Sequence, residues 1–137
     1  MDFGFSEQEE KFRQEVRDFL AKEIPPSWVK GGMWTEGEID SEEEWDFWKS
    51  IQRKLAEKGW LGISWPKQYG GLGHPHMEQA IFSEEMGYRG APGTAAGNFP
   101  HFGPTLLVWG TEEQKKKYLP QVAKGERDWV DAMAEPD

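Results

Sequence analysis

Three short segments led by serine or threonine most constrain how this chain can fold. Residues 6–9 (SEQE), 41–44 (SEEE) and 111–114 (TEEQ) each place Glu or Gln three positions after a hydroxyl side chain. In this spacing, the capping box, the hydroxyl accepts a hydrogen bond from an early helical N–H and the later side chain bonds back to the cap. The three segments therefore predict three helix starts.

Apolar side chains follow each start at the spacing of one helix face. They are Phe12, Val16, Phe19 and Leu20, then Phe47, Trp48, Ile51 and Leu55, and finally Tyr118, Leu119 and Val122. Positions three and four apart lie on the same side of an α-helix, so each set predicts a buried stripe. Pro25-Pro26 ends the first helix, because proline lacks the N–H that a helix needs.

Two more helices are expected between the second and third starts. One spans about residues 76–86, with Met77, Ala80 and Ile81 facing inward, and is broken by Gly87, Gly90, Pro92 and Gly93. The other begins at Pro100 or Pro104 and ends at Gly110; the apolar side chains that it carries are Leu106, Leu107 and Trp109. The glycine-rich stretch 59–75 is predicted to be a loop.

The predicted fold is therefore all-α, a bundle of about five helices starting near residues 6, 41, 76, 100 and 111. A short strand is expected at the end of the chain, within RDWVDAMAE (127–135).

The charge balance and composition exclude several kinds of partner. With 16 Lys and Arg against 25 Asp and Glu, the net charge is −9, which argues against nucleic acid. The consecutive lysines 115–117 point about 100° apart on a helix and so predict a solvated face. The N-terminus lacks the pattern of a signal peptide, and no apolar run is long enough to span a bilayer. We therefore expect a cytoplasmic protein with no membrane partner.

Side chains that could carry chemistry do not form a recognisable site. His74 and His76 lack a third metal ligand at suitable spacing. The glycines of 70–73 lack the strand and helix that flank a phosphate loop. Most carboxylates fall on predicted helix surfaces or caps, so none is nominated as a general base. No catalytic residue and no metal site is predicted.

Four strings that occur in order carry a specific family pattern. They are KGWLGISWPKQYGGLG (58–73), SEEMGYRGAP (83–92), GPTLLVWGTEEQKKKYLPQVAKGE (103–126) and AEPD (134–137). Together they closely resemble the N-terminal portion of flavin-dependent acyl-CoA dehydrogenases, over almost the whole chain. The GPTLLVWG form looks most like the bacterial branch that also handles bulky or unusual acyl-CoA substrates.

The resemblance implies a helical N-terminal domain over residues 1–126 and the start of a middle β-domain over 127–137. In the family, FAD lies between the middle and C-terminal domains, and a glutamate of the C-terminal domain removes the substrate's α-proton. The resemblance implies flavin contacts at Asp131, Met133 and Ala134. Ala134 departs from the family, which usually has serine or threonine there.

The resemblance also implies that Phe99, His101 and Phe102 border the acyl-chain cavity. Ordinary core packing is an equally good interpretation of the two phenylalanines. The side chains of Trp129, Val130 and Met133 are expected to form an exposed apolar patch where the middle domain would dock.

Two functions from different classes follow. The first is an N-terminal fragment of an FAD-dependent acyl-CoA dehydrogenase that is inactive alone and does not retain FAD. Its partners would be acyl-CoA, the missing middle and C-terminal domains, and further subunits of a homo- or hetero-oligomer. The alternative is a stand-alone helical interaction module, or a partner subunit of a hetero-oligomer.

Overall fold

The computed structural model describes residues 4–28, 39, 41–94 and 101–129. Their α-helices are α1 (Glu7–Glu23), α2 (Glu42–Glu57), α3 (His76–Arg89), α4 (Gly103–Trp109) and α5 (Glu112–Ala123). Two short 3-10 helices, η2 (Trp60–Gly62) and η3 (Lys67–Tyr69), interrupt the loop between α2 and α3. The described residues contain no strand, and the all-α fold is confirmed. Of the expected terminal strand, 127–129 have no regular structure and 130–135 lie outside the described residues.

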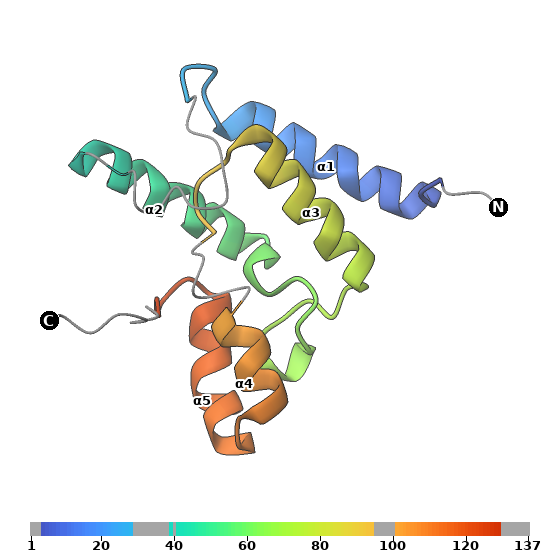
Figure 1. Cartoon of the computed structure of the whole chain (residues 1–137), viewed down its shortest axis with the longest axis vertical. Helices are drawn as coiled ribbons and strands as arrows, with labels where there is room; N and C mark the ends of the chain where they lie inside the picture. Colours follow the sequence, from blue (N-terminus) through green and yellow to red (C-terminus); the bar gives the residue numbers. More distant parts are fainter. Residues whose placement is uncertain (1–3, 29–38, 40, 95–100, 130–137) are drawn as a thin grey trace, which may run out of the picture.

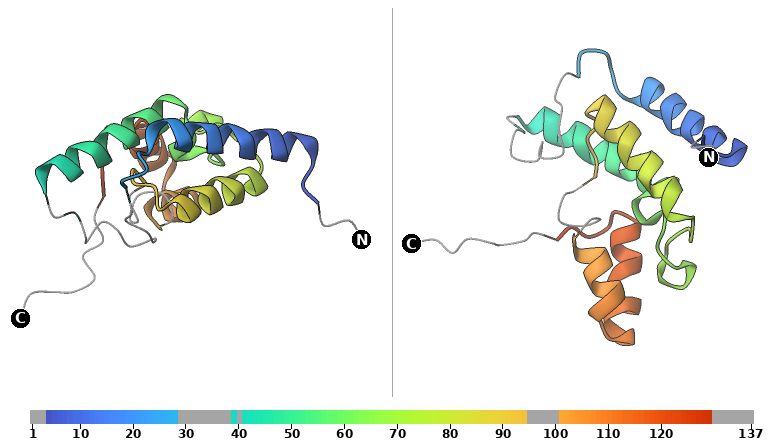
Figure 2. Two further views of the ribbon diagram at one scale, coloured as in Figure 1. Left: turned by 90° about the horizontal axis from the view of Figure 1, so that it is seen from above. Right: turned by 45° about the vertical axis from the view of Figure 1, so that its right-hand side comes forward.

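The helices form two groups at opposite ends of the molecule. α1 and α3 lie side by side at one end, and α4 and α5 form a hairpin at the other (Figures 1 and 2). The loop that carries η2 and η3 connects the two groups. Both 3-10 helices contact α5, while Trp60 of η2 packs against Phe12 of α1 and Phe82 of α3.

The expected helix starts are present. At α1, the Ser6 hydroxyl accepts from the Glu9 N–H at 3.3 Å, and the Glu9 carboxylate accepts from the Ser6 N–H at 2.7 Å. Thr111 and Gln114 form the same reciprocal pair at α5. At α2, the Ser41 hydroxyl accepts from the Glu44 N–H at 3.2 Å. These bonds satisfy N–H groups that the first helical turn would otherwise leave unpaired.

A first core lies between α1, α2, η2 and α3, and Trp60 is at its centre. The Trp60 ring makes edge contacts with Phe19 at 5.3 Å, Phe82 at 5.7 Å and Phe12 at 5.8 Å between ring centroids. The helical stripes predicted for α1 and α2 face this core, with Ile51 and Leu55 fully buried. Trp60 belongs to the stretch predicted only as a loop, so that loop supplies part of the core.

A second, separate core lies under the α4–α5 hairpin. Its buried members are Trp65, Tyr69, Leu119, Val122 and Ala123. Trp65 sits directly on the backbone of Gly103, where an added Cβ atom would lie 2.0 Å from the indole ring. A side chain at position 103 would therefore collide with a buried indole, which explains the glycine at the start of α4.

Two details of the predicted helices are wrong. α3 continues through Gly87 to Arg89, so Gly87 does not break it, and it ends at Gly90, another of the expected breaks, whose φ of 61° is in the left-handed region that glycine tolerates. Met77 is 49% exposed and Ala80 is also exposed. The side chains of α3 that are buried instead are Glu78, Ile81, Phe82, Glu85 and Met86.

The inward face of α3 is rotated because its two glutamates find polar partners. Arg13 and Arg17 of α1 bind Glu85, while Gln8 and His74 bind Glu78. Charged partners make the burial of a carboxylate tolerable. The spacing of apolar residues along the sequence gives no indication of such ion pairs and hydrogen bonds.

Candidate functional site

Of the residues expected to border an acyl cavity, the structure describes two. His101 is exposed, just before α4, and Phe102 is half-buried. The Phe102 ring stacks on Trp129, with 4.0 Å between centroids and 13° between planes. Phe99 lies outside the described residues. Phe102 therefore packs against the second core.

Trp129 is placed differently from the expectation that it belongs to an exposed patch. It is half-buried, stacked on Phe102 and 5.4 Å from the Tyr118 ring in an edge contact. Aromatic pairs of this kind stabilise one another by about 0.5–1.5 kcal/mol beyond the burial of their area. Val130, Met133 and the other expected flavin contacts, Asp131 and Ala134, lie outside the described residues.

The segment that follows α5 is fixed in direction by Gly125. Its φ is 66°, its N–H donates to Val122 O at 2.9 Å, and the next N–H, of Glu126, donates to Gln121 O at 2.9 Å. These two bonds form a Schellman motif, a helix ending in which a left-handed residue turns the chain away from the helix axis. The backbone after α5 therefore leaves at a defined angle.

Asp128 ties the same segment to α2. Its carboxylate accepts from Gln52 Nε2 at 2.8 Å and forms an ion pair with Lys49. Lys49 Nζ also donates to Gln52 Oε1 at 3.2 Å, so the three side chains form a closed ring of hydrogen bonds. Gln52 is 1% exposed, and both ends of its amide are bonded in this ring.

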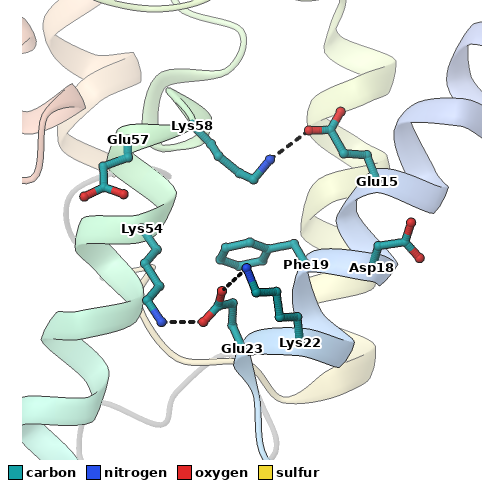
Figure 3. A pocket seen from close by; sticks show the side chains of 8 residues that line it. All are labelled: Glu15, Asp18, Phe19, Lys22, Glu23, Lys54, Glu57 and Lys58. Carbon is teal, nitrogen blue, oxygen red and sulfur yellow. Dashed lines mark hydrogen bonds and ion pairs between the residues drawn. The ribbon is translucent and has the colours of Figure 1, made fainter.

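A pocket of about 420 Å³ lies between α1 and α2, away from these residues (Figure 3). Phe19 and seven charged side chains line it: Glu15, Asp18, Lys22, Glu23, Lys54, Glu57 and Lys58. Glu23 faces Lys54 and Lys22, and Lys58 reaches Glu15 at 2.9 Å. The hydrogen bond from Lys54 is the main reason why the pKa of Glu23 is lowered. All three lysines are paired within the pocket, so it offers no free cationic group to an anionic ligand.

The glycine-rich loop does not form a phosphate cradle. The N–H groups of Leu72, Gly73 and His74 donate to carbonyls of the preceding turn at 2.9–3.1 Å. A Cβ atom at Gly71 would lie 2.2 Å from Trp65 O. A phosphate site needs backbone N–H groups that point outward, whereas these are used to fold the loop onto itself. The glycines permit close packing here.

One of the described histidines, His74, pairs with a carboxylate of α3. His74 Nδ1 lies 2.6 Å from the Glu78 carboxylate, and Phe12 contacts the imidazole edge. Across the described part of the chain, no group of three His, Cys, Asp or Glu side chains is arranged to hold a metal ion. In that part of the chain, none of the helices combines the length and the apolar character that crossing a membrane requires.

The described residues of this region bind and position other parts of the chain. They offer an aromatic surface around Phe102 and a firmly held chain segment at 125–129. The sequence motifs did not indicate Lys49, Gln52, Asp128 or the stacking of Trp129, because these contacts join residues far apart in the chain. Only the Lys124-Gly125 pair carries a readable signal, that of a helix end.

The comparisons with known proteins agree with this architecture. Residues 6–126 match the family described as "Acyl-CoA dehydrogenase, N-terminal domain". The chain is 30% identical over 136 residues to acyl-CoA dehydrogenase FadE26 of Mycobacterium tuberculosis, covering 99% of this chain and 33% of that protein.

Two solved structures are similar to this chain. The ChsE4–ChsE5 complex from Mycobacterium tuberculosis matches with a TM-score of 0.71 and 30% identity, over 92% of this chain and 30% of that one. An acyl-CoA dehydrogenase complexed with FAD from Bacillus anthracis matches with a TM-score of 0.71 and 29% identity, over 90% and 20%.

The chain thus spans about a third of the length of FadE26. The match to the family's N-terminal domain covers far more than half of the chain, and the resemblance seen in the sequence is confirmed. The chain belongs to the acyl-CoA dehydrogenase family, as an N-terminal helical domain.

Proposed function

We propose that this chain works as the N-terminal domain of an FAD-dependent dehydrogenase that oxidises an acyl-CoA thioester between its α and β carbons. The observation that carries the proposal is the family match over residues 6–126. Supporting it, the similar Bacillus anthracis structure is described as complexed with FAD. The domain border at residue 126 and the start of a middle β-domain at 127 are part of the proposal.

In this function the chain lines the acyl pocket and supports the flavin site, while the flavin carries out the redox step. Phe102 would offer its ring to an aliphatic acyl chain, together with Phe99 and His101. Apolar side chains suit such a pocket because they are removed from water when the ligand binds. The stack of Phe102 on Trp129 would hold that ring in one orientation.

FAD would be contacted at Asp131, Met133 and Ala134, through backbone groups near the edge of the ring system. The glycine-rich loop at 70–74 provides no cradle for its pyrophosphate, since the N–H groups of Leu72, Gly73 and His74 are bonded to nearby carbonyls. Following the family resemblance, we assign the main flavin site and the base that takes the α-proton to the middle and C-terminal domains. The 137-residue chain alone should neither retain FAD nor turn over acyl-CoA.

Oligomerisation with a second subunit type is part of the proposal, because one of the similar structures is a complex of two differently named proteins, ChsE4 and ChsE5. A partner subunit that completes an active site between two chains is the second function we consider on this ground. The two proposed functions differ in whether the middle and C-terminal domains belong to the same polypeptide as this domain or to a partner subunit.

The test is to purify the chain, add FAD, a panel of acyl-CoA thioesters and an artificial electron acceptor, and record turnover and visible absorbance. We expect no turnover and a colourless protein after gel filtration. A longer polypeptide that continues into middle and C-terminal domains should be yellow and active. Turnover by the short chain, or a longer polypeptide that binds no flavin, would contradict the proposal.

A further inference from the structure

We propose that the tip of the α4–α5 hairpin is a self-association surface, at which a second copy of this chain docks across a two-fold axis. The hairpin tip comprises the last turn of α4 and the first two turns of α5, and its contact residues are Val108, Trp109, Glu113 and Lys116. The proposed function includes an oligomer but assigns it no surface. The pairing needs neither flavin nor substrate.

The apolar part of the hairpin tip is the outer side of α4. This helix ends in four apolar side chains, and two of them, Leu106 and Leu107, pack against the second core. The other two face solvent, since Val108 is 67% exposed and Trp109 is 84% exposed. Tryptophan is enriched among the side chains that contribute most to binding between proteins. Trp109 is therefore suited to anchor a contact with another molecule.

The charged part of the hairpin tip lies on α5 and carries both signs. Glu113 and Lys116 are exposed, and neither takes part in an ion pair among the described residues. Of the two lysines beside Lys116, Lys115 pairs with Glu112 at 3.7 Å and Lys117 lies 5.1 Å from the centre of an aromatic ring. Because Glu113 and Lys116 are three residues apart, they are separated by about 4.5 Å along the helix axis.

A two-fold axis between these two charges makes the hairpin tip complementary to itself. In such an isologous contact, residue i of one copy meets residue j of the other, and j meets i. With the two α5 helices antiparallel, Glu113 of each copy faces Lys116 of the other copy, which gives two ion pairs. A partner surface of a single charge sign would leave one of the two side chains unpaired. The hairpin tip therefore fits a second copy of the chain.

The apolar and the charged parts are close enough to belong to one contact. Only four residues separate Trp109 from Glu113, so the chain allows them to lie at most about 14 Å apart. Both parts are at the same end of the hairpin, where α4 ends at Trp109 and α5 begins at Glu112. One partner can therefore cover the exposed ring and meet both charges.

The distribution of charge along the chain also favours this end for self-association. Residues 101–129 hold five basic and four acidic side chains, whereas the remainder of the chain holds 11 basic and 21 acidic ones. The hairpin and the α1–α3 pair lie at opposite ends of the molecule (Figure 1). Two copies that meet through their hairpins keep their acidic parts apart, so their repulsion is weaker than in a contact through α1 and α3.

Sedimentation velocity of the 137-residue chain over a wide concentration range tests the association. We expect a reversible change from monomer to dimer, and Trp109→Ala should weaken dimerisation about tenfold or more. The matched control is Tyr88→Ala, since Tyr88 is 92% exposed but belongs to α3, and this variant should dimerise like the parent. Circular dichroism verifies that both variants keep the helix content of the parent. A chain that stays monomeric throughout, or a Trp109→Ala variant that dimerises like the parent, would overturn the proposal.

Charge reversal tests the two-fold pairing itself. Glu113→Lys and Lys116→Glu should each weaken dimerisation about tenfold or more, because each places like charges opposite one another. An equimolar mixture of the two variants, one of them carrying a fluorescent dye, should form a heterodimer with an affinity close to that of the parent. In that heterodimer every introduced charge meets its opposite. The double variant Glu113→Lys/Lys116→Glu should dimerise like the parent for the same reason.

Asp18→Lys and Lys11→Glu are the controls for these reversals. Both side chains are exposed on α1, and the two variants change the net charge by the same amounts as the reversals on α5. They should dimerise like the parent. A mixture of the α5 variants that associates as weakly as each variant alone, or α1 controls that weaken dimerisation equally, would contradict a contact through the hairpin tip.

Discussion

The guanidinium of Arg13 lies 2.9 Å from the Glu85 carboxylate, and both side chains are almost fully buried between α1 and α3. Glu85 also binds Arg17 at 2.9 Å. Replacing Glu85 by Ala should lower the free energy of unfolding by about 3–5 kcal/mol, because it leaves the Arg13 charge buried without that partner. Urea unfolding followed by circular dichroism measures the change.

Glu84→Ala is the matched control for this ion pair. Glu84 binds the same arginine at 2.9 Å, but its side chain is 61% exposed. An exposed pair contributes only about 0–1 kcal/mol, so this variant should unfold close to the parent. Equal losses in the two variants would show that burial does not govern the strength of these pairs.

Two glycines in helices should respond in opposite directions to alanine. At Gly103 the new Cβ atom would collide with the buried Trp65 ring, and the free energy of unfolding should fall by about 1–3 kcal/mol or more. At Gly87, inside α3, no atom other than the chain neighbours and the nearby helix backbone lies within 4 Å of the new Cβ. Gly87→Ala should therefore raise the free energy of unfolding by about 0.5–1 kcal/mol through helix propensity.

Thermal melts of the two alanine variants beside the parent measure this difference. A stabilised Gly103→Ala, or a Gly87→Ala that melts below the parent, would contradict the packing described at these positions. The second outcome would also favour a helix break at residue 87, which the sequence predicts and the structure does not show.

Lowering the pH should reduce the stability of the fold, because it protonates the carboxylate of Glu23. The hydrogen bond from Lys54 lowers the pKa of this carboxyl below its ordinary value of 4.5, against an opposing effect of desolvation. A group with a lowered folded-state pKa stabilises above its unfolded pKa and loses that effect as pH falls. Glu23→Gln should therefore show a weaker fall in melting temperature than the parent between neutral pH and pH values below 4.5.

Glu57→Gln lines the same pocket and serves as the control for Glu23, since it carries no lysine contact among the described pairs. We expect it to follow the parent on acidification. Identical acid profiles for the parent and Glu23→Gln would show that the Lys54 contact does not form in solution.

Alkaline pH should act through Tyr69, whose hydroxyl donates to both carboxylate oxygens of Glu112 at 2.8 and 3.0 Å. This hydrogen bond, together with burial, raises the pKa of Tyr69 above 10.0. The stability that it provides is complete below pH 10 and declines as pH rises through the folded-state pKa. Tyr69→Phe should be less stable at neutral pH and lose less above pH 10, as melting curves at several pH values would reveal.

Local signals in the sequence account for the helices but not for how they meet. Capping at Ser6 and Thr111 depends on neighbouring residues, and so it can be recognised from spacing alone. The inward face of α3 cannot, because Glu85 is buried against Arg13 and Arg17 of α1, and Arg13 is 72 residues away in the sequence. The apolar spacing predicted that Met77 faces inward, and this prediction is wrong for the same reason.

The candidate site, too, could be predicted only in part from the sequence. The family pattern pointed to Phe102, and the structure adds that its ring is held by Trp129. The link from Asp128 to Gln52 crosses 76 residues and involves residue types with no motif of their own. Contacts of this kind depend on the packing of whole helices, which no short string encodes.

The two cores have a consequence for how the chain folds. Trp60 belongs to the first core and Trp65 to the second, yet five residues allow them to separate by at most about 18 Å. Neither core can be completed while the loop between them is still unplaced, although α1 and α3 could pair beforehand. A substitution at Ile63, which is buried in the first core only two residues before Trp65, should therefore disturb both ends of the molecule together.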